Sequence, residues 1–245
     1  MDMGQVGGMA FISKLNSSGE YVWATNFGGT GDSGGGGVGY SVAVDSSGNV
    51  YATGKFRSSG LGHMSAGSDD AFVSKWDSSG TLVWANRVGA DAPTPSSWYA
   101  PDYGYSVAVD SSGNVYTTGR FNLTADFDPG AGTENLNGGS NGDAFVWKLD
   151  SSGDYVWAKN LGSGQREEGH SVAVDSSGNV YITGWSGGIN TFDFDPGAGT
   201  TNLTLNGSYD VFVSKLDSSG NLAPAVDPGF TLSATSVSVA ESGTT

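Results

Sequence analysis

One eleven-residue segment, SVAVDSSGNVY, occurs three times in the chain, at residues 41–51, 106–116 and 171–181, and each copy starts 65 residues after the previous one. A second segment alternates with the first. Its copies are MAFISKLNSSGEYVWATNFG from Met9, DAFVSKWDSSGTLVWANRVG from Asp70, DAFVWKLDSSGDYVWAKNLG from Asp143 and the shorter DVFVSKLDSSGNL from Asp210. Repeats with a period of tens of residues indicate a solenoid, a propeller or another array of stacked units.

Each segment has the pattern of a strand, a tight turn and a second strand. Val42 and Val44 alternate with Ser41 and Ala43, which is the two-residue period of a β-strand. The sequence DSSGN that follows is typical of a turn, because Asp and Ser cap backbone N–H groups and Gly accepts a positive φ. We find no apolar stripe with the 3.6-residue spacing of a helix. The sequence therefore predicts an all-β protein built from hairpins.

Two hairpins per 65 residues predict four-stranded antiparallel sheets. The first strand of each sheet, SVAVD, carries no charge before its final Asp, which predicts burial on both sides. The third strand carries one Lys in every copy, and the fourth carries Trp23, Trp84 or Trp157 beside polar neighbours. A decrease of burial from the first strand to the fourth is what a propeller blade requires, with the first strand lining the axis. We expect the Trp side chains to pack between neighbouring blades; stacking on a carbohydrate is the alternative.

The phrase AVDSSGNVYxTG followed by DAFVxKLDSSGxxVWAxxxG resembles the bacterial β-propeller repeat known from seven-bladed propellers of large secreted and surface proteins. The resemblance extends from Met9 to Leu222 and implies a propeller, but it implies little about activity. Counting strands predicts an incomplete β-propeller of about three and a half four-stranded blades, whereas closed propellers have about 4–8. The repeat segment spans residues 1–222, with a half blade at 9–28, blades at 39–89 and 104–162, and a partial blade at 169–222.

Residues 223–245 form a predicted linker and the first strand of a following module. The stretch FTLSATSVSVAESGTT from Phe230 alternates like a strand and resembles the start of a Calx-β or immunoglobulin-like domain. An open stack of blades leaves the apolar flanks of its terminal blades uncovered, and monomers rarely expose such patches. The sequence therefore predicts self-association through these flanks.

The charge of the chain narrows the range of partners. Lys and Arg total 10 against 25 Asp and Glu, which gives a net charge of −15, so nucleic acid and anionic membrane are poor partners. The chain has no Cys and no run of about 18 apolar residues that would predict membrane insertion. This composition fits a bacterial protein that is extracellular or on the cell surface. The N-terminal residues lack the pattern of a signal peptide, so export would require a leader beyond them.

The two ends of the predicted blades differ in sequence variability. All seven turns between first and second or third and fourth strands are of the [DN]SSG type, whereas the other connections vary, as at 29–39, 90–104 and 162–169. A ligand site is expected at the variable end, because connecting loops commonly carry binding residues. Mere tolerance of insertions is the alternative explanation.

Two groups of acidic residues are candidate Ca²⁺ ligands. Two of the variable loops share the phrase DFDPGAGT, and its carboxylates could converge with backbone carbonyls on a hard cation. In the alternative, these Asp residues cap a structural turn. Acids before the first strands could ring the mouth of a central channel. The candidate metal ligands are Asp126, Asp128, Asp193 and Asp195 in the first group, and Asp32, Asp102, Glu167 and Glu168 in the second.

The sequence gives little support for catalysis. Its two histidines are His63, in a Gly-rich loop, and His170, which replaces Tyr40 and Tyr105 of the other copies. No GxSxG, HExxH or phosphate-binding loop occurs. We expect a noncatalytic structural or binding module of a larger bacterial secreted or surface protein, with a protein or glycan partner and no certain cofactor. A calcium-dependent adhesive module is the first alternative, and a carbohydrate-active enzyme is the second.

Overall fold

The computed structural model describes residues 8–27, 36–57, 59–60, 63–64, 69–90, 101–162, 164–188, 191–204 and 207–223. Every regular element in these ranges is a β-strand, which confirms the all-β prediction. No helix in the described part of the chain has the length and hydropathy needed to span a membrane.

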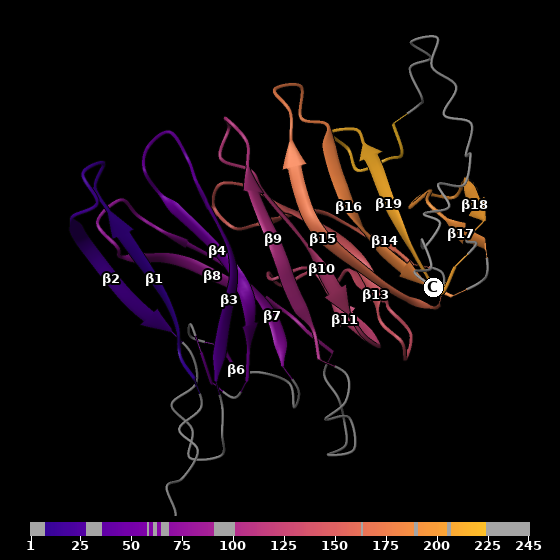
Figure 1. The fold of residues 1–245 in the computed structure, drawn as a ribbon, viewed down its shortest axis with the longest axis horizontal. Coiled ribbons are helices and arrows are strands. Elements are labelled where there is room, and N and C mark those ends of the chain that lie inside the picture. Colours follow the sequence, from indigo (N-terminus) through magenta and orange to yellow (C-terminus); the bar gives the residue numbers. More distant parts are fainter. Residues whose placement is uncertain are drawn as a thin grey trace, which may run out of the picture.

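The strands form antiparallel sheets in chain order (Figure 1). The first sheet contains β1 (Ala10–Leu15) and β2 (Tyr21–Phe27). The second and third sheets each have four strands: β3 (Gly37–Val44), β4 (Val50–Phe56), β7 (Asp70–Trp76) and β8 (Leu82–Val88), then β9 (Tyr103–Val109), β10 (Val115–Phe121), β13 (Asp143–Leu149) and β14 (Tyr155–Leu161). The fourth sheet contains β15 (Arg166–Val174), β16 (Val180–Gly187) and β19 (Tyr209–Leu216).

Short hairpins are inserted between the second and third strands of three sheets. They are β5 (Ser59–Gly60) with β6 (His63–Met64), β11 (Thr124–Asp126) with β12 (Asn135–Asn137), and β17 (Thr191–Asp193) with β18 (Asn202–Thr204).

The four larger sheets stand side by side in chain order, from indigo to yellow in Figure 1. Three apolar clusters hold successive sheets together. Ile12 of the first sheet packs with Phe72 of the second, Val73 of the second with Phe145 of the third, and Val146 of the third with Phe212 of the fourth. Stacking of separate sheets through their broad faces agrees with propeller repeats, whereas a β-helix would continue one sheet through all repeats.

The Trp side chains lie between sheets, as the sequence predicts. Trp157 donates a hydrogen bond from Nε1 to the Ser218 carbonyl at 3.1 Å, and Lys148 Nζ reaches the same oxygen at 3.3 Å. The ring covers Gly220, whose φ of 79° favours glycine. Trp84 and Trp23 make the corresponding bonds to Ser151 and Ser78. Each Trp–Lys pair thus clamps the turn of the next sheet.

The predicted decrease of burial from first to fourth strand is wrong. The most buried strands are the second and third of a sheet, since all seven residues of β10 and of β13 are buried. In β3, by contrast, Val42 and Val44 are exposed. The described part of the first sheet consists of β1 and β2, which correspond to the third and fourth strands of a complete sheet. The first sheet therefore has no described first strand that could cover β3.

Each first strand contains a β-bulge at the same repeat position. The register shifts between Gly39 and Ser41 in the second sheet, between Gly104 and Ser106 in the third, and between Gly169 and Ser171 in the fourth. The additional residues are Tyr40, Tyr105 and His170. The bulge explains why one aromatic position recurs there, because an extra residue in a strand redirects its side chain.

The number of blades and the division into domains stay predictions. Residues 224–245, which carry the resemblance to a Calx-β or immunoglobulin-like module, lie outside the described residues.

Candidate functional site

The seven [DN]SSG turns are fully engaged in structural hydrogen bonds. Asp175 Oδ1 accepts from the N–H groups of Ser177 and Asn179 at 2.9 Å, while Oδ2 accepts from the Asn179 amide at 2.8 Å and the Tyr181 hydroxyl at 3.1 Å. The Asn179 side-chain bond and the other hydrogen bonds lower the pKa of Asp175 to about 2. The constant sequence of these turns therefore has a local structural cause, and no ligand is needed to explain it.

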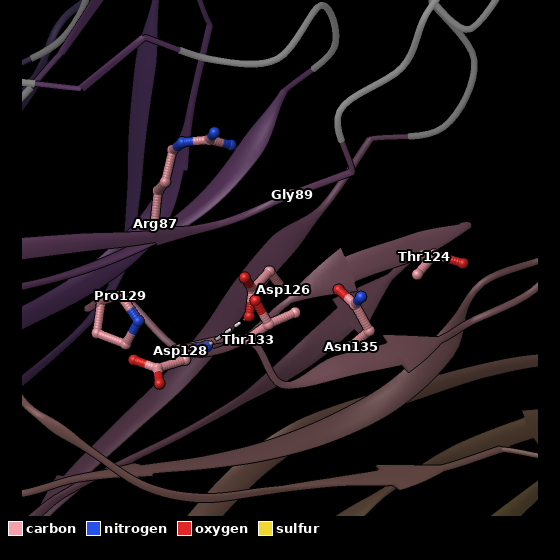
Figure 2. A pocket seen from close by; sticks show the side chains of 8 residues that line it. All are labelled: Arg87, Gly89, Thr124, Asp126, Asp128, Pro129, Thr133 and Asn135. Atoms are coloured by element: carbon pink, nitrogen blue, oxygen red, sulfur yellow. Dashed lines mark hydrogen bonds between the residues drawn. The ribbon is translucent and has the colours of Figure 1, made fainter. Parts of the chain in front are cut away.

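A polar pocket of about 480 Å³ lies at the other end of the sheets, where the β11–β12 hairpin meets the end of β8 (Figure 2). Arg87 and Gly89 come from the second sheet, and the remaining lining residues come from the hairpin and its turn: Thr124, Asp126, Asp128, Pro129, Thr133 and Asn135. The pocket therefore exists only because two sheets are adjacent.

The hairpin turn is organised by two carboxylates. Asp126 Oδ1 accepts the backbone N–H groups of Asp128 at 3.0 Å and Glu134 at 2.8 Å, and Asp128 Oδ1 accepts that of Gly130 at 2.8 Å. Phe127, between the two acids, is fully buried. These contacts support the interpretation of the Asp pair as turn caps.

The second DFDPGAGT loop has the same geometry. Asp193 Oδ1 accepts the N–H groups of Asp195 at 3.0 Å and Thr201 at 2.8 Å, and Asp195 Oδ1 accepts that of Gly197 at 2.8 Å. This hairpin belongs to the fourth sheet, so the two Asp pairs form separate sites. Within the described ranges, no group of three or more His, Cys, Asp or Glu side chains is arranged to hold a metal ion. Calcium at either pair would need further oxygen ligands, and it stays a prediction.

Asp102 and Glu167 occupy equivalent repeat positions and are buried between sheets. The backbone N–H of Asp102 donates to the Asp69 carbonyl at 2.7 Å, and that of Glu167 donates to the Gly142 carbonyl at 3.0 Å. Asp102 Oδ1 accepts the Asn122 N–H at 2.7 Å. The residues Asp102 and Glu167 are 1% and 0% exposed, so both side chains are enclosed at successive sheet junctions. The sequence had suggested a different position for them, at the mouth of a central channel.

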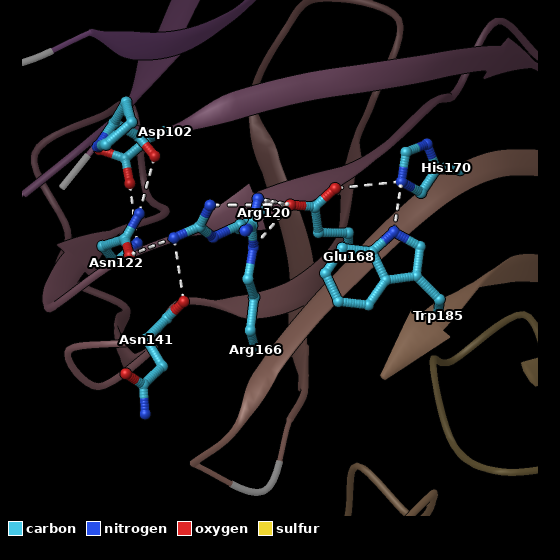
Figure 3. Close-up of polar contacts among 9 residues, drawn as sticks. Asp102, Arg120, Asn122, Asn141, Arg166, Glu168, His170 and Trp185 are labelled. Atoms are coloured by element: carbon cyan, nitrogen blue, oxygen red, sulfur yellow. Dashed lines mark hydrogen bonds and ion pairs between the residues drawn. The ribbon is translucent and has the colours of Figure 1, made fainter. Parts of the chain in front are cut away.

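Glu168 belongs to a polar network that ends at the protein surface (Figure 3). Its Oε1 lies 2.8 Å from Arg166 Nη2 and 3.6 Å from Arg120 Nη1, and its Oε2 lies 3.0 Å from His170 Nε2. Trp185 Nε1 also lies 3.0 Å from that His170 nitrogen. Because two guanidinium groups already balance the buried carboxylate, Glu168 is poorly placed to attract a cation. Asp32 lies outside the described residues.

His170 continues an aromatic stack along the bulges. Its ring is parallel to that of Tyr105, with centroids 4.8 Å apart, and Tyr105 stacks on Tyr103 at 5.3 Å. This supports a packing role for His170. Sequence reasoning missed Trp185, although it stands where Lys55 and Arg120 stand in the other copies, and a departure from the repeat could have identified it.

Asp102 gives the protein a predictable pH dependence. Burial, and to a lesser extent the nearby Asp70 charge, raise the pKa of Asp102 well above its ordinary value. A raised folded-state pKa means that the contribution to stability is present below the unfolded pKa of about 4 and is lost as the pH rises towards the folded pKa. Asp102→Asn keeps an oxygen acceptor for the Asn122 N–H. Urea unfolding should therefore show the variant gaining stability relative to the wild type between pH 4 and 7.

Ser111→Ala, in an exposed turn, removes no titratable group and is the control, so its stability should run parallel to that of the wild type at every pH. Parallel curves for Asp102→Asn as well would contradict a raised pKa of the buried Asp102 carboxyl.

A sequence model described as "Beta-propeller repeat" (SBBP) matches residues 99–120 and 156–193. Regulatory protein FlaEY of Caulobacter vibrioides is 28% identical over 158 residues, which is 64% of this chain and 15% of that protein. An uncharacterized WD repeat-containing protein of Acanthamoeba polyphaga mimivirus is 25% identical over 214 residues, 72% of this chain and 14% of that protein. The chain therefore spans about one seventh of these relatives. A crystal structure of a protein of unknown function from Bacteroides caccae aligns with 89% of this chain and 79% of its own, at 13% identity and a TM-score of 0.34.

Proposed function

We propose that the chain is a noncatalytic binding module of a larger bacterial secreted or cell-surface protein, and the match of two of its segments to a beta-propeller repeat model supports this. The proposal places a protein or glycan ligand in the pocket between β8 and the β11–β12 hairpin. The observation that carries it is the polar pocket of about 480 Å³ that the second sheet and the β11–β12 hairpin form together, at the end of the sheets where the connections vary in sequence.

The chemistry of the pocket favours a ligand rich in hydroxyl or amide groups. Asn135, Thr124 and Thr133 are exposed and offer both donors and acceptors, while Asp126 and Asp128 add carboxylates. The pocket also receives Arg87, whose Nη1 is 2.9 Å from Asp70 Oδ2 and is thereby held in place. Convergent polar groups in a concave site are the usual basis of specific recognition.

Two of the relatives are named as a regulatory protein and as a WD repeat-containing protein, and neither name describes an enzyme. This agrees with a module that binds without catalysing a reaction. Because the pocket is polar and its two hairpin carboxylates cap a turn, the proposal assigns them to ligand contact and to loop geometry instead of acid–base chemistry.

The pocket can be tested with a glycan array and with peptide libraries. Thr133→Ala combined with Asn135→Ala is expected to reduce binding of any ligand found by about tenfold or more, since each lost hydrogen bond costs about 1 kcal/mol. Both residues are exposed, so the fold should be unaffected. Ser111→Ala, in an exposed turn at the opposite end, is the matched control and should bind normally. Equal binding by the double variant and the wild type would place the ligand elsewhere.

A calcium-dependent binding module is the alternative form of this proposal, and it is tested by a Ca²⁺ titration together with the binding assay. The carboxylates of Asp126 and Asp128 both line the pocket, and oxygen ligands are those that Ca²⁺ prefers. Titration of chelator-treated protein with Ca²⁺ that releases no heat, together with ligand binding that is unchanged by chelator, would remove calcium from the proposal.

A further inference from the structure

Among the described residues, none covers one broad apolar face of the first sheet and one of the fourth sheet. On the first sheet Phe11, Leu15 and Tyr21 are 72%, 56% and 70% exposed. On the fourth sheet Val211 and Val213 are 81% and 74% exposed. Both groups of side chains lie on strands whose opposite faces are buried, and contiguous apolar faces of this kind mark interaction sites.

The exposed face of the first sheet corresponds to a face that is covered in every other sheet. Phe11 is equivalent to Phe72, Phe145 and Phe212, which are 1%, 0% and 4% exposed and pack against the preceding sheet. The residues equivalent to Leu15 are likewise buried, namely Trp76, Leu149 and Leu216. We call this uncovered surface of the first sheet (Phe11, Leu15, Tyr21) the leading face.

The exposed face of the fourth sheet is the complementary half of the same junction. Val213 is equivalent to Ile12, Val73 and Val146, which are 4%, 0% and 0% exposed because each packs against the following sheet. The residues equivalent to Val211 are also buried, namely Ala10, Ala71 and Ala144. We call this surface (Val211, Val213) the trailing face.

Polar groups of the repeated junction are also present on the two faces. At each internal junction a Lys and a Trp contact the turn of the following sheet, and the Trp rings cover Gly80, Gly153 and Gly220. The equivalent Gly19 of the first sheet has no atom within 4 Å of the position of a Cβ. On the trailing side, Lys215 lies 5.3 Å from the ring of Tyr181, as Lys148 lies 5.1 Å from Tyr116.

We propose that a second copy of this chain covers these faces head to tail, with the trailing face of one copy stacked on the leading face of the next. The chain forms this junction three times internally, and the two uncovered faces carry parts of its two unlike sides: the third and fourth strands on the leading face, and the third strand of a three-stranded sheet on the trailing face. Such a contact is heterologous, so it either closes into a ring or continues into a longer assembly. It leaves the pocket between the second and third sheets accessible, and it stands independently of the proposed binding function.

The first test is the mass of the wild-type protein in sedimentation experiments over a range of concentrations. We expect the average mass to rise from that of one chain to that of two or more. Val213→Glu and Phe11→Glu should each weaken association by about tenfold or more, because each places an unpaired charge in a buried contact. Both positions are solvent-exposed in the single chain, so thermal unfolding of the dilute proteins should be little changed.

The decisive test mixes the two variants. Phe11→Glu keeps an intact trailing face and Val213→Glu keeps an intact leading face, so an equimolar mixture should form complexes of two chains and none larger. Val83→Glu, on the outer strand β8 with a comparably exposed Val, is the matched control and should associate like the wild type. A wild type that stays a single chain throughout, or a mixture that stays monomeric while the wild type associates, would overturn the proposal.

Discussion

Gly119→Ala is expected to unfold the protein, or to lower its free energy of unfolding by more than about 4 kcal/mol. A Cβ at this position would overlap the carbonyl oxygen of Tyr103 and would lie 2.9 Å from the ring of Phe145. Neither neighbour can move easily, because the first is backbone in the adjacent strand and the second is fully buried. Urea unfolding followed by tryptophan fluorescence measures the loss.

Gly39→Ala is the matched control for this prediction. Gly39 lies beside the bulge of the second sheet, as Gly104 does in the third, but no atom lies within 4 Å of the position of its Cβ. The control should unfold at nearly the wild-type urea concentration. If Gly119→Ala were as stable as the control, the close approach of β9 and β10 at the bulge would be wrong.

The local structure of this chain could be predicted from the sequence because its determinants are local. Alternating Val residues specify strands, and an Asp that caps its own turn specifies a hairpin, so both could be recognised within five or six residues. The position of Trp157 between sheets was also predictable, since an aromatic residue that recurs at one position in three of the four units needs an equivalent partner in each following unit.

Burial and the site depend on contacts between repeats, and these could not be predicted. The same SVAVD strand is exposed at Val42 and buried at Val107 and Val172, because only the latter two follow a complete sheet. The pocket combines Arg87 with a hairpin more than thirty residues later in the chain. Likewise, Asp102 is enclosed at a junction between two sheets, and no pattern in the sequence around it predicts this burial.

Trp157→Ala is expected to lower the free energy of unfolding by about 3–5 kcal/mol. The ring is buried, lies against Gly220 and packs edge-on with Tyr116 at 6.3 Å, so its removal leaves a cavity between the third and fourth sheets. The Ser218 carbonyl loses one of its two donors and keeps Lys148. Most of the loss should therefore come from packing, and Trp157→Phe should restore more than half of it. Urea unfolding of the three proteins measures both effects.

Trp23→Ala is the matched comparison, because Trp23 makes the same contacts with Ser78 and Gly80 but is only half-buried. Its loss should lower the free energy of unfolding less than the loss of Trp157, since the free-energy change of a large-to-small substitution increases with the volume of the cavity that remains.

The stability of stacked repeats also depends on the strength of each junction between neighbouring repeats. A weakened first junction should therefore release only the first sheet, whereas a weakened third junction separates the fourth sheet. Equal losses in the two variants would show that burial of the ring does not determine the strength of these junctions.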